Sequence, residues 1–344
     1  MITRWIYCVL LMIGCTAMAR AEIYELPPHG SDVIGAISTI TARDEDTLVD
    51  IARRHGLGYE DIVRANPDVN VWVPGQGTEI ILPTQYVLPA GDRRGVILNL
   101  AEYRLYYFPK PVAGEPAYVM TYPISIGRMD WETPLGLTTV IAKATNPAWY
   151  PPQSVRDEHA ADGDPLPRIV PPGPENPLGK HAMRLGLPGY LIHSTNRPAG
   201  VGMRVTHGCV RMFPEDIEYL FGHIDISTRV RIINAPVKMG WNGDQLVMEA
   251  HRVLETTSPT VDDPFEDVTQ EKLEQAEARR AAAVANEVIR DPLTFVTEQY
   301  ITATGERAGQ LDWHLAEEVV GRADGIPVAV GTGIKNAATS AASE

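Results

Sequence analysis

Short runs of β-branched and aromatic residues follow one another through the middle of the chain, and they constrain its fold most. These runs lie at residues 96–100, 104–108, 118–126, 137–142, 190–195 and 229–233. Glycine and proline separate them, as is typical of β-strands joined by turns. The first two runs flank only three residues, so we expect a hairpin there. This spacing predicts a mainly β domain, built as a sheet or a sandwich, over residues 94–234.

A small α+β unit is predicted over residues 37–83. A strand near residue 40 precedes a helix that Asp46 or Thr47 can cap and that ends at Gly56, because glycine suits the left-handed conformation after a helix. A second helix is expected over residues 59–65, where Asn66 and the following proline stop it. A final strand at 78–82 gives the order strand, helix, helix, strand.

Three further segments complete the predicted organisation. A helix is expected from Pro214, since proline suits the first helical position. Residues 146–177 are rich in proline and polar residues, and a loop of this length is usually a functional cover or is disordered. For residues 245–344 we expect a C-terminal extension that is helical at 266–290 and 310–320 and disordered at the end. The whole chain is therefore predicted to be an α+β protein.

The N-terminus predicts export. Residues 1–21 combine Arg4, an apolar run too short to span a bilayer, and small residues at positions 17 and 19, which together form a signal peptide. Lipidation of Cys15 is a less favoured alternative. We expect an envelope location, in the periplasm. The formal net charge of −14 argues against nucleic acid as a partner.

Cys209 is the strongest candidate for chemistry. The chain has three cysteines, and Cys8 and Cys15 lie in the predicted signal, so Cys209 is expected to be unpaired in an exported protein. A neighbouring imidazole, a cation or a helix N-terminus lowers the pKa of a thiol and makes it a nucleophile. His193 ends an apolar run 16 positions earlier, and two facing edges could bring its ring to the sulfur.

The residues beside Cys209 suggest supporting roles. The N–H groups of Gly208 and Cys209 could form an oxyanion hole, and Arg211 could bind a substrate carboxylate. Simpler alternatives remain open: Arg211 could pair with Asp216, and His207 could be a second base, an oxyanion donor or a turn residue.

Two other kinds of site were weighed. His193, His207 and Cys209 could together bind zinc, although the usual ligand spacings are absent. A Cys/His peptidase of the NlpC/P60 type would place its cysteine before its histidine, and the downstream His223 and His251 have no motif around them.

Two segments resemble the signature of the L,D-transpeptidases, the YkuD-type catalytic domain. They are His193-Ser194-Thr195-Asn196 and Thr206-His207-Gly208-Cys209-Val210-Arg211-Met212, with Ser194 where many members have glycine and Thr206 in place of serine. Residues 133–136, 146–149 and 176–179 are similar to the ErfK/YbiS-like branch. The resemblance covers about residues 94–234. Residues 37–83 resemble a LysM module.

The resemblance implies a peptidoglycan enzyme with a mainly β sandwich as its catalytic domain. Cys209 would attack the third residue of a tetrapeptide stem and release D-Ala, with His193 as base, the carbonyl of Ser194 orienting it, and His207 nearby. An amine of a second stem or of an envelope protein would accept the acyl group. No metal or cofactor is implied, and carbapenems would acylate the thiol.

Binding roles follow from the same resemblance. We assign substrate contacts to Arg211, Thr195 and Tyr190. The LysM-like unit would bind glycan, and Asp46, Thr47 and Asn66 are its candidate residues. As a separate module, it would be dispensable for reaction with soluble muropeptides. Two alternatives are kept: an L,D-carboxypeptidase that uses water as the acceptor, and an inactive protein that tethers through the LysM-like unit.

Overall fold

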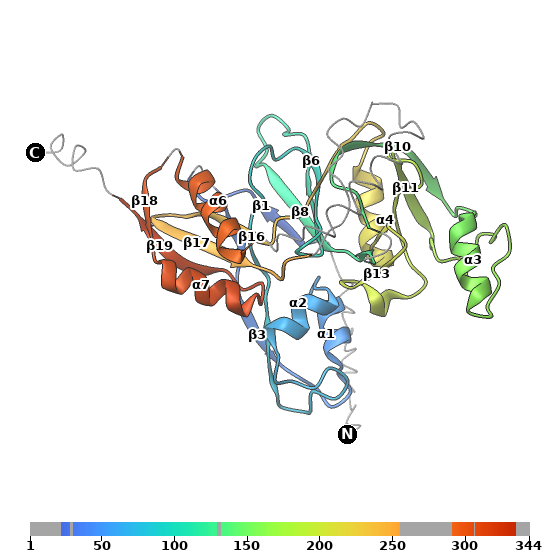
Figure 1. Cartoon of the computed structure of the whole chain (residues 1–344), viewed down its shortest axis with the longest axis horizontal. Helices are drawn as coiled ribbons and strands as arrows, with labels where there is room; N and C mark the ends of the chain where they lie inside the picture. Colours follow the sequence, from blue (N-terminus) through green and yellow to red (C-terminus); the bar gives the residue numbers. More distant parts are fainter. Residues whose placement is uncertain (1–21, 28–29, 129–131, 255–290, 306, 335–344) are drawn as a thin grey trace, which may run out of the picture.

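The computed structural model describes residues 22–27, 30–128, 132–254, 291–305 and 307–334. The predicted signal at 1–21 and the helix expected at 266–290 lie outside these ranges. Figure 1 shows three parts: a small N-terminal βααβ unit, a large sheet and a C-terminal unit of strands and helices. None of the helices described has both the length and the apolar character that a bilayer crossing requires.

The N-terminal βααβ unit has the predicted order of elements. Its parts are β3 (Ser38–Thr41), α1 (Leu48–Arg54), α2 (Tyr59–Ala65) and β4 (Glu79–Leu82). The two strands pair antiparallel, and both helices bury their apolar faces against them. Thr47 caps α1, since its Oγ1 accepts a hydrogen bond from the Asp50 amide at 3.0 Å. Gly56 ends this turn with a φ of +61°, as its position after the helix predicts.

One continuous sheet forms the large middle part of the protein. Its strands, in spatial order, are β1 (Glu22–Glu25), β8 (Tyr118–Pro123), β7 (Arg104–Phe108), β6 (Gly95–Asn99), β15 (Arg229–Ile233), β10 (Gly136–Thr145), β11 (His181–Leu185), β12 (Leu191–His193) and β14 (Val210–Arg211). The hairpin of β6 and β7 is as predicted. Strand β1 belongs to the segment before the βααβ unit and pairs with β8.

The predicted mainly β domain is one continuous sheet, and β10 explains how its two halves are joined. The first four residues of β10 pair with β15, and its second half pairs with β11. The register shifts between Val140 and Ala142. Such an irregularity bends a strand without ending it. The strands therefore form a single bent sheet, because one long strand belongs to both halves.

Shorter elements surround the far end of this sheet. They are β9 (Ile126–Gly127), α3 (Gln153–Ala161), the 3₁₀-helix η1 (Pro198–Gly200), β13 (Arg204–Thr206) and α4 (Pro214–His223). Strands β13 and β9 pair in parallel. The predicted helix at Pro214 is thus confirmed, and its apolar face packs into the core of the sheet. The predicted loop at 146–177 contains α3, which the sequence did not predict.

The C-terminal unit corrects the expectation for residues 245–344. It contains β16 (Val237–Asn242), β17 (Gln245–Ala250), α6 (Pro292–Thr304), β18 (Gly309–Leu311), α7 (Trp313–Arg322) and β19 (Val328–Gly333). The strands form a sheet in the order β16, β17, β19, β18. The helix expected at 310–320 is present as α7, but the unit is α+β, not helical, and it begins at Val237. Residues 335–344 lie outside the described residues.

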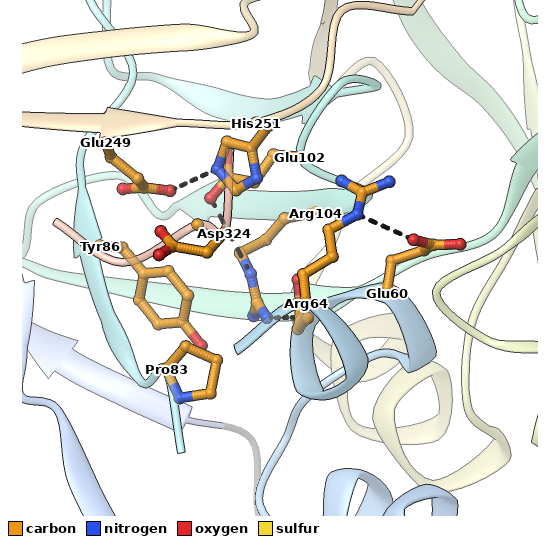
Figure 2. A pocket seen from close by; sticks show the side chains of 11 residues that line it. Glu60, Arg64, Pro83, Tyr86, Glu102, Arg104, Glu249, His251 and Asp324 are labelled. Atoms are coloured by element: carbon orange, nitrogen blue, oxygen red, sulfur yellow. Dashed lines mark hydrogen bonds and ion pairs between the residues drawn. The ribbon is translucent and has the colours of Figure 1, made fainter. Parts of the chain in front are cut away.

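A buried set of charges lies where the three parts meet. Lys238 of β16 contacts Glu102 at 2.8 Å and Glu249 at 2.9 Å, and Arg104 of β7 contacts Asp61 of α2 at 2.7 Å. Figure 2 shows Glu102, Arg104 and Glu249 around a small polar cavity between the parts. These contacts join the sheet to both the N-terminal βααβ unit and the C-terminal unit. No motif in the sequence predicts this cluster.

The strands β2 (Val33–Gly35) and β5 (Gln85–Val87) connect the N-terminal βααβ unit to the rest of the chain. They pair antiparallel on either side of it. The backbone amide of Val87 donates to Glu249 at 2.6 Å. The entry and exit of the unit are therefore both fixed, and it is not joined by a free linker.

Candidate active site

Two paired strands bring the two motif segments together. Strands β12 and β14 run parallel, with Ile192 opposite Val210 and His193 opposite Arg211. Side chains of directly paired residues lie on the same face of a sheet. Cys209 immediately precedes β14, and the same register continued by one residue sets it opposite Leu191, two positions before His193. The motif thiol and the ring of His193 therefore lie diagonally on one face of this strand pair.

His193 is buried, and its ring is oriented by one backbone contact. Its Nδ1 lies 2.6 Å from the carbonyl oxygen of Ser194. A carbonyl only accepts hydrogen bonds, so Nδ1 carries the proton and Nε2 keeps its lone pair. Burial, and secondly the charge of Arg211, lower the pKa of His193 to about 3. The ring is therefore neutral at physiological pH and able to accept a proton at Nε2.

Cys209 is a free, half-buried thiol. Its Sγ donates to the carbonyl oxygen of Gly189 at 3.6 Å, and within the described residues no hydrogen bond joins it to the ring of His193. Burial raises the pKa of the thiol, while the amide of Leu191 and the charge of Arg211 oppose this rise. We expected a lowered thiol pKa, and this expectation was wrong because burial outweighs the cation. The resting pair is a thiol and a neutral imidazole.

The backbone at Gly208 and Cys209 leaves its N–H groups available. Gly208 has a φ of +90°, a conformation that favours glycine. Its carbonyl accepts from Thr133 Oγ1 at 2.7 Å, and the carbonyl of Cys209 accepts from Thr206 Oγ1 at 2.5 Å. In the part of the chain that the structure describes, neither amide N–H has an acceptor. Both can therefore donate to a substrate oxygen.

Arg211 is available to an anion at this site. Its Nε is buried without a hydrogen-bond partner, and no described carboxylate forms an ion pair with its guanidinium. The alternative of a pair with Asp216 is therefore wrong. Burial lowers the pKa of Arg211, while the nearby thiol of Cys209 opposes this shift.

The other two predicted substrate contacts differ from each other. Tyr190 is half-buried, and its hydroxyl donates to the carbonyl of Glu132 at 3.3 Å. Burial, and then the charge of Cys209, raise its pKa. Thr195 is buried, and its hydroxyl accepts from the amide of Arg197 at 2.9 Å. Its side chain thus supports the loop, and its contact with substrate stays a prediction.

His207 contacts the segment predicted to be a cover. Its Nε2 lies 2.9 Å from Glu158 Oε2 on α3, and the other oxygen of Glu158 pairs with Arg128 at 2.6 Å. The amide of Asn176 donates to three carbonyls of the segment, the nearest being that of Pro147 at 2.9 Å. These contacts fold the segment at 146–177 and connect it to the motif through His207.

A zinc site at the motif is not supported by the geometry. The described residues whose ligand atoms lie close enough to share a metal ion are Glu102, Glu249 and His251, and not the motif histidines and Cys209. The ammonium of Lys238 already lies between the two carboxylates of that buried set. His251 belongs to this buried set, where it contacts Glu249 at 2.7 Å. This contact does not place it as the base of a Cys/His peptidase.

The three candidate glycan-binding residues have structural contacts. Asp46 is buried and pairs with Arg54 at 2.7 Å. Thr47 caps α1, as described above. The amide of Asn66 is buried and makes three hydrogen bonds with the backbone, two of them to Ile81. These contacts hold the N-terminal βααβ unit together, and the assignment of the three residues to glycan binding stays a prediction.

Three residues support the site through contacts that the sequence did not predict. Thr133 orients Gly208, Glu158 binds His207, and Gly179 lies against Ser194, where a Cβ would come within 2.6 Å of the serine Cβ. Thr133 and Gly179 lie in segments that resemble the ErfK/YbiS-like branch, which was the available signal. Glu158 had no signal, because its helix was not predicted.

The comparisons with known proteins agree with this geometry. Residues 93–232 match the family model of the YkuD L,D-transpeptidase catalytic domain. The probable L,D-transpeptidase YcfS of Escherichia coli strain K12 is 38% identical over 270 residues, which cover 76% of this chain and 82% of YcfS. The probable L,D-transpeptidase ErfK/SrfK of Salmonella typhimurium strain LT2 is 36% identical over 313 residues, covering 90% of this chain and 91% of the relative.

A third relative gives the same result. The probable L,D-transpeptidase YbiS of Escherichia coli strain K12 is 38% identical over 250 residues, which cover 72% of this chain and 80% of YbiS. The chain belongs to the L,D-transpeptidase family. This family acts on peptidoglycan, and its substrate is consistent with a location in the cell envelope.

Proposed function

We propose that the protein is a cysteine L,D-transpeptidase that cross-links peptidoglycan or attaches an envelope protein to it. The observation that carries the proposal is the tautomer of His193. The Ser194 carbonyl fixes the proton on Nδ1, so Nε2 can act as a base on the face of the strand pair that also carries Cys209.

The first half-reaction transfers an acyl group to sulfur. Rotation of the Cys209 side chain away from Gly189 brings the thiol to Nε2, as catalytic hydrogen bonds often form only with substrate bound. Sulfur attacks the carbonyl carbon of the third stem residue while His193 takes the thiol proton. The amides of Gly208 and Cys209 stabilise the resulting oxyanion. When the intermediate collapses, the imidazolium gives its proton to the nitrogen of D-Ala, which leaves.

The second half-reaction reverses these roles. An amine attacks the thioester carbonyl, His193 takes a proton from it, and the thiolate leaves and is reprotonated. A neutral resting pair suits this cycle, because His193 must alternate between base and acid. Arg211 is the candidate for binding a stem carboxylate, since its guanidinium has no carboxylate partner in the described part of the chain.

We further propose that the N-terminal βααβ unit binds the glycan strand as a LysM module. Support comes from its order of elements and from two exposed apolar residues, Trp72 (63% exposed) and Val73 (70% exposed). The amides of both residues donate to Asn70 Oδ1, which fixes this loop. Residues 1–21 would act as the export signal, with lipidation at Cys15 as the alternative.

The test is a reaction with purified tetrapeptide stems, with and without an acceptor amine, followed by mass spectrometry. The expected products are free D-Ala and a cross-linked dimer, and both should be lost in a folded Cys209→Ala variant. Tripeptide without dimer, whatever the acceptor, would instead identify an L,D-carboxypeptidase. Absence of any product from a folded protein that binds sacculi would favour the tether.

A further inference from the structure

The loop immediately before the Cys209 motif forms the cap of a helix in the N-terminal βααβ unit. The amides of Tyr59 and Glu60, at the start of α2, donate to the carbonyls of Val201 and Gly202 at 3.0 and 3.3 Å. The first amides of a helix have no partner within it and usually bond to a capping side chain or water. Here the backbone of the motif loop supplies the acceptors. Figure 1 shows α2 near β13, the short strand that follows this loop.

Two glycines allow this approach. A Cβ on Gly58 would lie 2.7 Å from the Cα of Gly202, and a Cβ on Gly202 would lie 2.3 Å from the nitrogen of Tyr59. Real Cβ atoms do not approach backbone this closely. Gly58 has a φ of −88°, which any residue can adopt. Only the contact with the loop, and not the backbone conformation, therefore requires glycine at this position.

A second contact fixes the other side of the motif. Arg53 of α1 forms two hydrogen bonds with the carboxylate of Glu215 on α4, at 2.7 and 2.8 Å. Its guanidinium also lies over the ring of Phe213, 5.4 Å from the centroid. Phe213 directly follows Met212, the last residue of the motif. The N-terminal βααβ unit therefore contacts the chain both before and after Cys209.

The segment at the start of β9 contacts the opposite side of the same loop. Ser125 Oγ donates to the carbonyl of Gly200 at 2.7 Å, and the amide of Ile126 donates to that of Met203 at 3.2 Å. Strand β13 then leads to Thr206, whose hydroxyl binds the Cys209 carbonyl. The loop is thus confined between β9 and α2, and it is joined through β13 to the backbone that presents the thiol.

We propose that the N-terminal βααβ unit positions the Cys209 loop, in addition to any binding of the cell wall. Gly58, Arg53 and Glu215 are positioning residues in this account. The inference rests on the proposed function for its effect on turnover. It also replaces the expectation that the unit is dispensable for soluble muropeptides.

The test compares Gly58→Ala with Gly321→Ala, a control in which the added Cβ has no atom within 4 Å. For Gly58→Ala we expect kcat with soluble tetrapeptide stems to fall at least tenfold, with unchanged binding to sacculi. The alkylation rate of Cys209 by iodoacetamide, measured against pH, should also change several-fold. The control should match the parent in all three. A folded Gly58→Ala variant with parental kcat and alkylation would overturn the proposal.

A charge exchange keeps the proposal testable if Gly58→Ala does not fold. Arg53→Glu and Glu215→Arg should each lower kcat, and the double variant should restore most of it, because the ion pair is rebuilt in reverse. Failure of the double variant to recover would contradict the positioning role. If the parent protein has no turnover, the proposed function fails separately, and alkylation of Cys209 still decides whether the unit and the loop are coupled.

Discussion

Replacement of Lys238 by methionine should strongly destabilise the protein. The ammonium is 2% exposed and lies 2.8 Å from Glu102, 2.9 Å from Glu249 and 3.0 Å from the hydroxyl of Tyr106. Burial alone would raise the pKa of Glu102. Lys238 and its cationic neighbours outweigh burial and bring this pKa to about 2. Without Lys238, two buried carboxylates lose their nearest cation. Removing one partner of a buried ion pair typically costs about 3–5 kcal/mol.

The assay is urea unfolding of the intact chain at neutral pH. With a slope of about 2–3 kcal/mol/M, this loss should lower the midpoint by about 1–2.5 M. Lys110→Met, on the exposed residue 110, is the matched control and should leave the midpoint unchanged. Addition of Glu249→Gln to Lys238→Met should recover part of the loss, since it removes one stranded charge. A midpoint within error of the parent for Lys238→Met would refute the reasoning.

Three further predictions concern the active-site end of the sheet. Burial, and then Glu215, raise the pKa of Asp216 to about 8, so the folded protein retains a proton that the unfolded chain releases above pH 4. The free energy of unfolding should therefore fall as the pH rises from about 4 to 8. Asp216→Asn should flatten this pH dependence in unfolding curves. Gly179→Ala should displace Ser194 and lower kcat at least tenfold, since Gly179 also has a φ of +61°; parental kcat would contradict this. Arg211→Lys should raise KM about tenfold with little change in kcat, because a lysine retains the charge but not the fork; an unchanged KM would remove Arg211 from substrate binding.

Local signals made the N-terminal βααβ unit predictable. Thr47 caps α1 and Gly56 ends it, and both effects depend on residues within one turn of the helix. The second helix has the predicted bounds, 59–65, because Asn66 and a proline stop it. The assignment of Asp46 and Asn66 to glycan binding came from the resemblance to a LysM module. No local signal indicated that the fold buries both side chains.

Long-range contacts were not predictable from this one sequence. Lys238 and Glu102 are 136 positions apart and meet only after three parts of the chain have packed together. The continuous sheet depends on β10 pairing with different partners along its length, which strand propensity does not encode. The site was predictable to the level of the motif. Its electrostatics were not, because burial decides the protonation of Cys209 and His193.

The central claim is that Cys209 becomes acylated by a stem peptide with His193 as the base. The most direct measurement is the intact mass of the protein after brief incubation with a tetrapeptide stem and no acceptor amine. The account predicts an adduct of the stem mass less D-Ala, mapped to Cys209 by digestion, which forms far more slowly in His193→Gln. Release of D-Ala by the Cys209→Ala variant at the parental rate would contradict this claim.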